Sequence, residues 1–176
     1  RAIDVGHERD RHFVSVLGIG FPSIVADEAN RVRWLRGSPA FFFAVYTGLH
    51  RLRAVPLEIH LDTGTIEMEC VAVLVQNTPY TGGGLLMAPE ADVDDGILDV
   101  VLVDDIGKLG LMINFPRVYH GGHFSHPSFT AHRTRSVRVR ASEPLPKMFD
   151  GDLCGRTPLE AEVVPDGVRI AIPGPR

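Results

Sequence analysis

Carboxylates gather in a short acidic loop near the middle of the sequence, between Glu90 and Gly96. Asp92, Asp94 and Asp95 lie close together there, and they do not alternate as exposed strand residues would. Hard cations such as Mg²⁺ take oxygen ligands, usually carboxylates together with carbonyls and waters. An EF-hand calcium loop is excluded: starting at Asp92 puts Ile97 at the position that requires glycine, starting at Ala91 loses the first ligand, and neither frame ends on glutamate. The loop predicts either a small magnesium site around Asp95 or an acidic turn closed by its own aspartates.

A second pair of carboxylates, Asp150 and Asp152, flanks a glycine in the sequence MFDGDLCG. On an extended turn, carboxylates at i and i+2 could face one centre, where one orients the reacting group and the other accepts a proton. The alternative is an Asp-Gly hairpin turn with a structural role alone. The residues themselves leave both interpretations open.

Three consecutive glycines, Gly82, Gly83 and Gly84, precede the acidic loop. Such a run lets backbone N–H groups approach a phosphate, which makes these glycines candidates for binding a nucleotide cofactor. The run matches neither the P-loop nor the dinucleotide fingerprint, and no helix start follows it. A flexible turn between two strands is therefore the alternative.

Histidines recur at three-residue intervals, at His120, His123 and His126. Zinc binds neutral imidazoles, but two glycines interrupt the helix that would align these side chains, and no fourth ligand is evident. The pattern favours a helix end with histidine near its C-terminus, where the helix dipole stabilises positive charge.

Alternating polar and apolar residues predict the strands that must position these groups. The predicted strands cover residues 2–5, 12–16, 55–61, 65–77, 97–105, 136–141, 145–152, 158–164 and 167–173. Helices are predicted over 23–37, 40–53 and 108–122, with a helix start at Ser38 and Pro39 and a chain break over 18–22.

Strand 65–77 changes from alternation to the apolar run VAVLV, which predicts a strand entering a core packed on both faces. Turn signals such as Asp62-Thr63-Gly64 favour hairpins and so a largely antiparallel sheet. We expect one domain of the α+β class, mainly β, with about eight to ten strands and two or three helices.

Composition agrees with a single globular domain: of 176 residues, 44% are hydrophobic and 23% charged. A net charge of −4 argues against a dedicated nucleic-acid binder. The apolar runs are strand-sized, too short for a membrane span, and the N-terminus lacks a signal peptide. Cys70 and Cys154 form no disulfide framework or zinc pattern, which favours a reducing cytoplasm. Because the chain opens on Arg1, we expect a fragment of a longer protein.

Four segments in order complete the pattern: FVSVLGIGFPSIVADEAN, NTPYTGGGLLMAPEADVDDGILDVVLV, RVYHGGHFSHPSF and FDGD. Together they resemble the C-terminal domain of the diacylglycerol kinase-like lipid kinases, a group that includes bacterial lipid kinases and, more distantly, sphingosine and ceramide kinases. The resemblance runs over residues 2–173, and the glycine turn followed by the acidic loop is its most specific part.

The resemblance implies the second domain of a two-domain lipid kinase, covering residues 1–176. Such a domain is an antiparallel β-sandwich-like structure with a few helices packed at its side. The first domain carries a GGDGT motif that cradles the nucleotide phosphates, and this chain has no such motif. The apolar helix within 41–52 would then form part of a lipid-facing cleft. Without the first domain, this fragment would be inactive.

Carried over from the family, the magnesium site falls on the Asp95 side chain and on the backbone carbonyls of Asp92 and Ile97. The catalytic DGE falls on residues 150–152, where this chain has Asp152 in place of glutamate, one methylene shorter. The resemblance implies transfer of the γ-phosphoryl group of ATP to a lipid hydroxyl, with Asp152 as proton acceptor and Asp150 as orienting group.

The implied partners are a lipid substrate, the nucleotide-binding domain in cis and, transiently, the inner face of the cytoplasmic membrane, with no nucleic acid. A homodimer and the identity of the lipid stay open. One alternative is a non-catalytic lipid-binding or regulatory relative, which the Glu-to-Asp change favours. Another is an NAD kinase-like enzyme of related architecture, which the acidic loop and the DGD turn disfavour.

Overall fold

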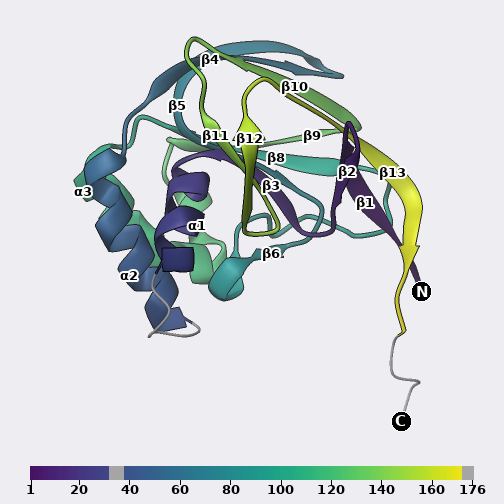
Figure 1. The fold of residues 1–176 in the computed structure, drawn as a ribbon, viewed down its shortest axis with the longest axis horizontal. Coiled ribbons are helices and arrows are strands. Elements are labelled where there is room, and N and C mark those ends of the chain that lie inside the picture. Colours follow the sequence, from purple (N-terminus) through teal and green to yellow (C-terminus); the bar gives the residue numbers. More distant parts are fainter. Residues whose placement is uncertain (32–37, 172–176) are drawn as a thin grey trace.

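The computed structural model describes residues 1–31 and 38–171 (Figure 1). Its strands, in chain order, are β1 Ala2–Glu8, β2 Arg11–Phe13, β3 Val16–Gly20, β4 Val55–Leu61, β5 Gly64–Gln76, β6 Tyr80–Thr81, β7 Leu85–Leu86, β8 Leu98–Asp104, β9 Phe129–Thr134, β10 Ser136–Ala141, β11 Pro146–Phe149, β12 Asp152–Arg156 and β13 Leu159–Arg169. Its helices are α1 Phe21–Arg31, α2 Ser38–Gly48 and α3 Gly107–Asn114, with 3₁₀ helices η1 Leu49–Arg51, η2 Gly82–Gly84, η3 Phe115–His120 and η4 Gly122–Ser125.

One sheet of 11 strands forms most of the domain, and β6 and β7 form a separate ribbon. The strands follow the order β12-β11-β3-β5-β4-β10-β13-β1-β2, and β8 pairs with both β5 and β9. All of these pairings are antiparallel, as predicted. The long strand β5 pairs with β4 along its first half and with β3 and β8 along its second half. This change of partners lets the sheet curl into the predicted sandwich-like form.

The apolar run of β5 faces two cores, as its sequence predicts. Val71 and Leu74 pack between the sheet and the helices, whereas Val73 and Val75 pack inside the curled sheet. Figure 1 shows α1, α2 and α3 together on one side of the strands, with the N-terminus on the far side. The mainly β fold with three α-helices is therefore confirmed, and its helices lie at the side of the sheet as expected.

The predicted chain break over 18–22 is wrong. Instead, β3 runs through Gly20 and passes directly into α1, which starts at Phe21. Gly20 has a φ of 78°, and a Cβ there would lie 2.6 Å from the Val71 carbonyl oxygen, so glycine is needed for close strand packing rather than for a loop. The described part of α1 ends at Arg31, and the rest of the helix predicted over 23–37 lies outside the described residues.

The predicted helix over 108–122 is also interrupted. The α-helix α3 ends at Asn114 and continues as the 3₁₀ helix η3, which has Pro116 near its start. Proline has no N–H to donate to the preceding turn, and its ring clashes with that turn, so it ends the α-helix. α2 starts at Ser38 as predicted, but it becomes the 3₁₀ helix η1 after Gly48.

Several strands begin or end at other residues than predicted, because their backbone groups bond to residues that are distant in sequence. The run 12–16 is divided between β2 and β3, because the N–H groups of Val14 and Ser15 donate to the Asp150 carboxylate instead of to a neighbouring strand. By contrast, the predicted strand 158–164 and the first part of the predicted strand 167–173 belong to the single strand β13, which ends at Arg169. The last two residues of the predicted strand, 172–173, lie outside the described residues. Asp166, at φ 54°, bends this strand, and the pairing of β1 with β13 shifts register between Ile3 and Val5.

Candidate functional site

An apolar cavity of about 280 Å³ lies between the helices and the sheet. Its α1 wall follows helical spacing, with Pro22, Ala26 and Ala29 four or three residues apart. The remaining wall comes from α2, α3, η3 and the sheet, and it includes Phe41, Val45, Val71, Ala72, Leu74, Val103, Leu111, Phe115, Val118 and Phe129. The predicted apolar cleft beside the helix within 41–52 is therefore present, with α1, α3 and η3 as further walls.

Polar groups stand at one end of this cavity, which we call the mouth. They are the side chains of Ser15, Asn30, Thr81 and Asp150, together with the backbone of Gly151. The Asn30 amide donates to the Gly151 carbonyl over 3.4 Å, which links the end of α1 to the turn. An apolar interior with a polar mouth suits a molecule that has a hydrocarbon chain and a polar head.

Asp150 and Gly151 form the two-residue turn between β11 and β12, with positive φ values of 48° and 99°. This is the geometry of a tight Asp-Gly hairpin. The Asp150 carboxylate accepts hydrogen bonds from the N–H groups of Val14, Ser15 and Val16 at 2.8, 2.8 and 2.9 Å. Asp150 therefore ties the turn to the connection between β2 and β3.

Asp152 differs from Asp150 in its surroundings. It is the first residue of β12, opposite Phe149 in register, and its side chain is exposed. Within 1–31 and 38–171 its side chain makes no hydrogen bond or ion pair, and Asp152 does not line the cavity. The structure thus brings Asp150 to the mouth and leaves the carboxylate of Asp152 beside the mouth, open to a reactant that approaches from solvent.

A hydroxyl pair at the mouth was missed by the sequence reasoning. The Ser15 and Thr78 hydroxyl oxygens lie 3.0 Å apart, and both hydroxyls lie within hydrogen-bonding distance of the Tyr80 carbonyl, at 3.0 and 2.8 Å. The neighbouring Asn77 amide donates to the carbonyls of Asp4 and Val14, both at 2.9 Å. The polar residues Asn77 and Thr78, directly after the buried strand β5, were the signal available in the sequence.

The glycine turn packs against α2. Cβ atoms built on Gly82 and Gly83 would lie 3.6 and 3.4 Å from the Phe41 ring, and Gly83 and Gly84 have positive φ values of 76° and 82°. Gly82 also lines the cavity mouth. These contacts explain the glycines as a close-packed turn, and the predicted approach of a phosphate to them stays a prediction.

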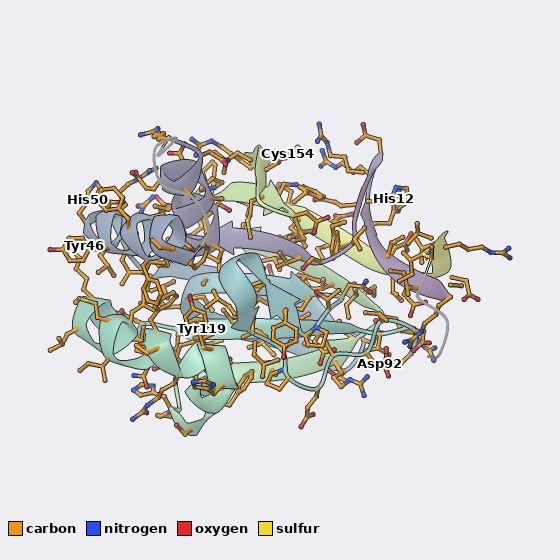
Figure 2. All side chains as sticks on the ribbon, turned by 90° about the horizontal axis from the view of Figure 1, so that it is seen from below. His12, Tyr46, His50, Asp92, Tyr119 and Cys154 are labelled. Carbon is orange, nitrogen blue, oxygen red and sulfur yellow. The ribbon has the colours of Figure 1, made fainter. Side chains whose placement is uncertain are left out.

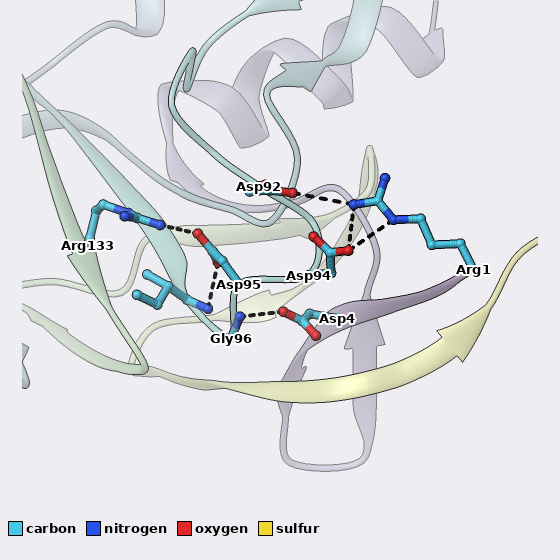
Figure 3. Close-up of polar contacts among 8 residues, drawn as sticks. Arg1, Asp4, Asp92, Asp94, Asp95, Gly96 and Arg133 are labelled. Carbon is cyan, nitrogen blue, oxygen red and sulfur yellow. Dashed lines mark hydrogen bonds and ion pairs between the residues drawn. The ribbon is translucent and has the colours of Figure 1, made fainter.

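Figure 3 shows how the acidic loop is held. Asp94 forms an ion pair with Arg1 at 2.6 Å, and Asp92 lies 3.7 Å from the same guanidinium. Beside them, the Gly96 N–H donates to the Asp4 carboxylate at 2.7 Å. The loop is therefore tied to β1 and the N-terminus.

Asp95, the predicted magnesium ligand, already has two partners. One oxygen accepts the Ile97 N–H at 3.0 Å, closing an Asx turn, and the other is paired with Arg133. The described residues contain no group of three or more acidic, histidine or cysteine side chains that could hold a metal. Each Asp95 oxygen nevertheless keeps a second lone pair, so the donor chemistry fits a cation held by this carboxylate and by carbonyls, with Arg133 as its competitor.

Asp99 lies beneath the loop and is almost completely buried. Burial raises the pKa of its carboxyl to about 6; the nearby Arg133 opposes this shift, and Asp95 and Glu90 reinforce it. Its cross-strand neighbour Gln76 is also fully buried, and both its amide atoms lack partners within the described part of the chain.

The three histidines do not converge on a metal. His120 is exposed at the end of η3, whereas His123 is fully buried, with Nε2 3.2 Å from the Met87 carbonyl. Burial lowers the pKa of His123, so this ring is neutral. His126 accepts a hydrogen bond from the Ser128 N–H. The helix-end interpretation is confirmed for His120.

Comparisons with known proteins agree with this architecture. A family profile described as "YegS C-terminal NAD kinase beta sandwich-like domain" matches residues 15–172. A diacylglycerol kinase of Mycobacterium tuberculosis (strain CDC 1551 / Oshkosh) is 33% identical over 178 residues, which cover 97% of this chain and 57% of that protein. A "Probable lipid kinase YegS-like" of Pseudomonas aeruginosa PAO1 is 29% identical, covering 98% of this chain and 57% of that protein.

The crystal structure of a diacylglycerol kinase from Bacillus anthracis str. Sterne shares the fold. Its TM-score is 0.63 at 19% sequence identity, and the match covers 94% of this chain and 52% of that one. This chain thus spans a little over half the length of the proteins it matches. The match over residues 15–172 shows that the chain belongs to the YegS C-terminal domain family of diacylglycerol and lipid kinases.

Proposed function

We propose that this chain is the lipid-binding domain of an ATP-dependent lipid kinase, which phosphorylates the hydroxyl of diacylglycerol or a similar lipid. The observation that carries the proposal is the apolar cavity whose polar mouth lies at the turn formed by Asp150 and Gly151. A hydrocarbon chain would lie among Ala26, Val45 and Leu74, and the hydroxyl of the lipid would stay at the mouth. The names of the M. tuberculosis and P. aeruginosa relatives support the same reaction class.

In the proposed reaction, the lipid hydroxyl oxygen attacks the γ-phosphorus of ATP. The new oxygen–phosphorus bond forms as the bond to the ADP oxygen breaks, and the hydroxyl proton passes to the carboxylate of Asp152. A carboxylate without competing partners suits this step, because it can accept the proton without first breaking an ion pair. Asp150 acts indirectly, by holding the turn against the backbone of residues 14–16.

We infer that ATP is held mainly by a nucleotide-binding domain elsewhere in the same protein, because no phosphate-binding motif occurs in this chain. The glycine turn at Gly82 would then face the nucleotide from the lipid side. Asp95, with the carbonyls of Asp92 and Ile97, would hold Mg²⁺, which when bound would neutralise the acidic loop. The kinase would act in the cytoplasm, at the inner face of the membrane, and its two thiols are free, as a reducing compartment requires.

The test is turnover of ATP by the full-length protein with a diacylglycerol panel. We expect Asp152→Asn to lower kcat by about 100-fold or more, because general-base catalysis contributes on that order. Asp152→Glu, which restores the longer side chain of the family, retains activity. Asp150→Asn lowers the melting temperature instead, since the turn loses a charged acceptor for three N–H groups.

Wild-type turnover in a folded Asp152→Asn protein would remove Asp152 from the mechanism. If the wild-type protein binds diacylglycerol but turns over no ATP with any lipid, the non-catalytic relative is the correct interpretation. Phosphorylation of NAD in place of lipid would support the NAD kinase-like alternative.

A further inference from the structure

The outer faces of α2 and α3 carry apolar side chains that point to solvent. On α2 these are Phe42, Phe43 and Tyr46, exposed by 45, 40 and 68%. On α3, at positions i, i+3 and i+4, they are Leu109, Met112 and Ile113, exposed by 70, 46 and 59%. We call these six residues the helical face.

The helical face is backed by the cavity. The inner side of α2 supplies Phe41 and Val45 to the cavity wall, and the inner side of α3 supplies Leu111. α2 is thus apolar on both sides, which is unusual for a helix at the surface of a water-soluble domain. Scattered apolar residues on a surface are ordinary, but a group on two neighbouring helices marks an interaction site.

Aromatic contacts join the two helices into one surface. The Phe42 ring lies edge-on to Phe115, with centroids 5.4 Å apart, and is stacked on Tyr119 at 5.7 Å. Both partners belong to η3, which continues α3. In Figure 2, α2 and α3 lie at the same end of the molecule, with Tyr46 at its outer edge. These contacts connect α2 to η3, the direct continuation of α3, at the end of the molecule where the helices lie.

The charge of the surrounding sequence points to an anionic partner. None of the 22 acidic residues lies in α2, α3 or η3, whereas two of the 18 lysines and arginines do. Lys108 and Arg117 lie exposed on α3 and η3, next to the apolar side chains. By contrast, the segment between Arg53 and Lys108 carries half of the acidic residues and no lysine or arginine.

We propose that the helical face docks onto the surface of a bilayer that contains anionic phospholipid. Apolar side chains would enter the boundary between headgroups and acyl chains, and the neighbouring cations would bind the headgroups. No helix of the described residues is long and apolar enough to span a bilayer. A lipid could then pass from the bilayer to the cavity directly behind α2; this last step rests on the proposed function.

The experiment measures binding of the full-length protein to vesicles by sedimentation. Vesicles of phosphatidylcholine alone are compared with vesicles that also contain phosphatidylglycerol. We expect binding to the anionic vesicles, weakening as NaCl is raised. The triple variant Tyr46→Ser, Leu109→Ser and Ile113→Ser, whose side chains are all exposed, should lose about tenfold or more of that binding. Ile170→Ser, which removes an exposed apolar side chain beyond the far end of β13, is the control and should bind as wild type.

Unchanged vesicle binding by the triple variant overturns the proposal. The proposal is also overturned if the triple variant changes its oligomeric state or domain association but keeps its vesicle binding. In that case a protein surface, and not a bilayer, covers the helical face.

A second readout separates docking from the proposed kinase activity. With a dispersed short-chain diacylglycerol as substrate, the triple variant should keep wild-type turnover. With diacylglycerol in anionic vesicles, the triple variant should lose turnover. A wild-type protein that binds vesicles through the helical face, yet phosphorylates neither form, disproves the kinase while upholding the docking.

Discussion

At the scale of single residues, the two aspartates around Gly151 have separate tasks. Their spacing in sequence suggests a shared centre, but Asp150 accepts three backbone N–H groups whereas Asp152 is exposed and unpaired within the described chain. The donors to Asp150 come from residues 134 to 136 positions away. No local sequence rule identifies such partners, so the structural role of Asp150 could not be separated from catalysis beforehand.

Asp99 gives a pH prediction at the same scale. In the folded chain its pKa is raised to about 6 from 3.8, so between these values the folded state keeps a proton that the unfolded state loses. Stability from this group therefore falls as pH rises from about 4 to about 6, by roughly 2–3 kcal/mol in total. Asp99→Asn should remove this slope, which is measured as the free energy of unfolding in urea at several pH values.

The control for this measurement is Asp105→Asn, which changes an exposed carboxylate just beyond the same strand. It should leave the slope between pH 4 and pH 6 as in wild type. An Asp99→Asn protein with the wild-type slope would show that the buried carboxyl titrates normally.

The acidic loop allows a test of the magnesium prediction. Because Arg133 already pairs with Asp95, a cation at this carboxylate must compete with the guanidinium. We expect Mg²⁺ to raise the melting temperature of wild type modestly, to raise that of Arg133→Gln more, and to leave that of Asp95→Asn unchanged. Differential scanning fluorimetry over a Mg²⁺ titration, with Ca²⁺ in parallel, measures all three.

An equal Mg²⁺ response in wild type and Asp95→Asn would place the metal elsewhere. Arg135→Gln is the matched control, since it removes a neighbouring arginine that has no ion pair to the loop within the described residues. Its response to Mg²⁺ should match that of wild type.

At the scale of elements, α1 sets the shape of the cavity. The small side chains of Ala26 and Ala29 leave room between this helix and the strands. Asn30 lines the mouth and donates to the Gly151 carbonyl. The sequence predicted a helix here, because helical periodicity is local. It did not predict that α1 and α2 would leave a gap between themselves and the sheet, since the gap depends on side chains from the strands opposite.

Filling this gap should change the preference for lipid length. Ala26→Leu adds volume at the cavity wall, so we expect turnover on long-chain diacylglycerol to fall about tenfold more than turnover on a short-chain form. The melting temperature should stay close to wild type, because the added atoms enter an existing space. Steady-state kinetics with a chain-length series of lipids provide the measurement.

Ala44→Leu is the comparison variant. Ala44 is completely buried in the same core but does not line the cavity, so the larger side chain overpacks it and costs about 1–3 kcal/mol of stability. It should show no change in chain-length preference. An identical preference in the two variants would mean that the cavity does not hold the acyl chain.

At the scale of the whole molecule, a buried ion pair closes the curled sheet. The Lys147 ammonium on β11 lies 2.6 and 2.8 Å from the two oxygens of the Glu8 carboxylate on β1, and both side chains are almost inaccessible. The Glu160 N–H from β13 also donates to Glu8 at 3.2 Å. One buried contact thus links three strands that are distant in sequence, and a lone buried charge at either position would be costly.

The charges and the helices are also separated over the whole molecule. The acidic loop, Asp95 included, lies on the sheet side with Arg1, whereas the helical face lies in segments of the chain without acidic residues. In the proposed docking, this separation would orient the molecule on an anionic bilayer, with the apolar helices toward the lipid and the acidic loop turned away from it.

The sequence by itself determined the mainly β class, the antiparallel pairing, the two-sided core strand β5 and the location of α2. These features follow from local periodicity and turn residues, which act between near neighbours. Only the tertiary structure decided that Asp150 binds the backbone of residues 14–16, that Arg133 faces Asp95, and that the helices enclose a cavity beside Asp152. The physical reason is that hydrogen bonds, ion pairs and packing between distant segments depend on the folded arrangement, which no local pattern encodes.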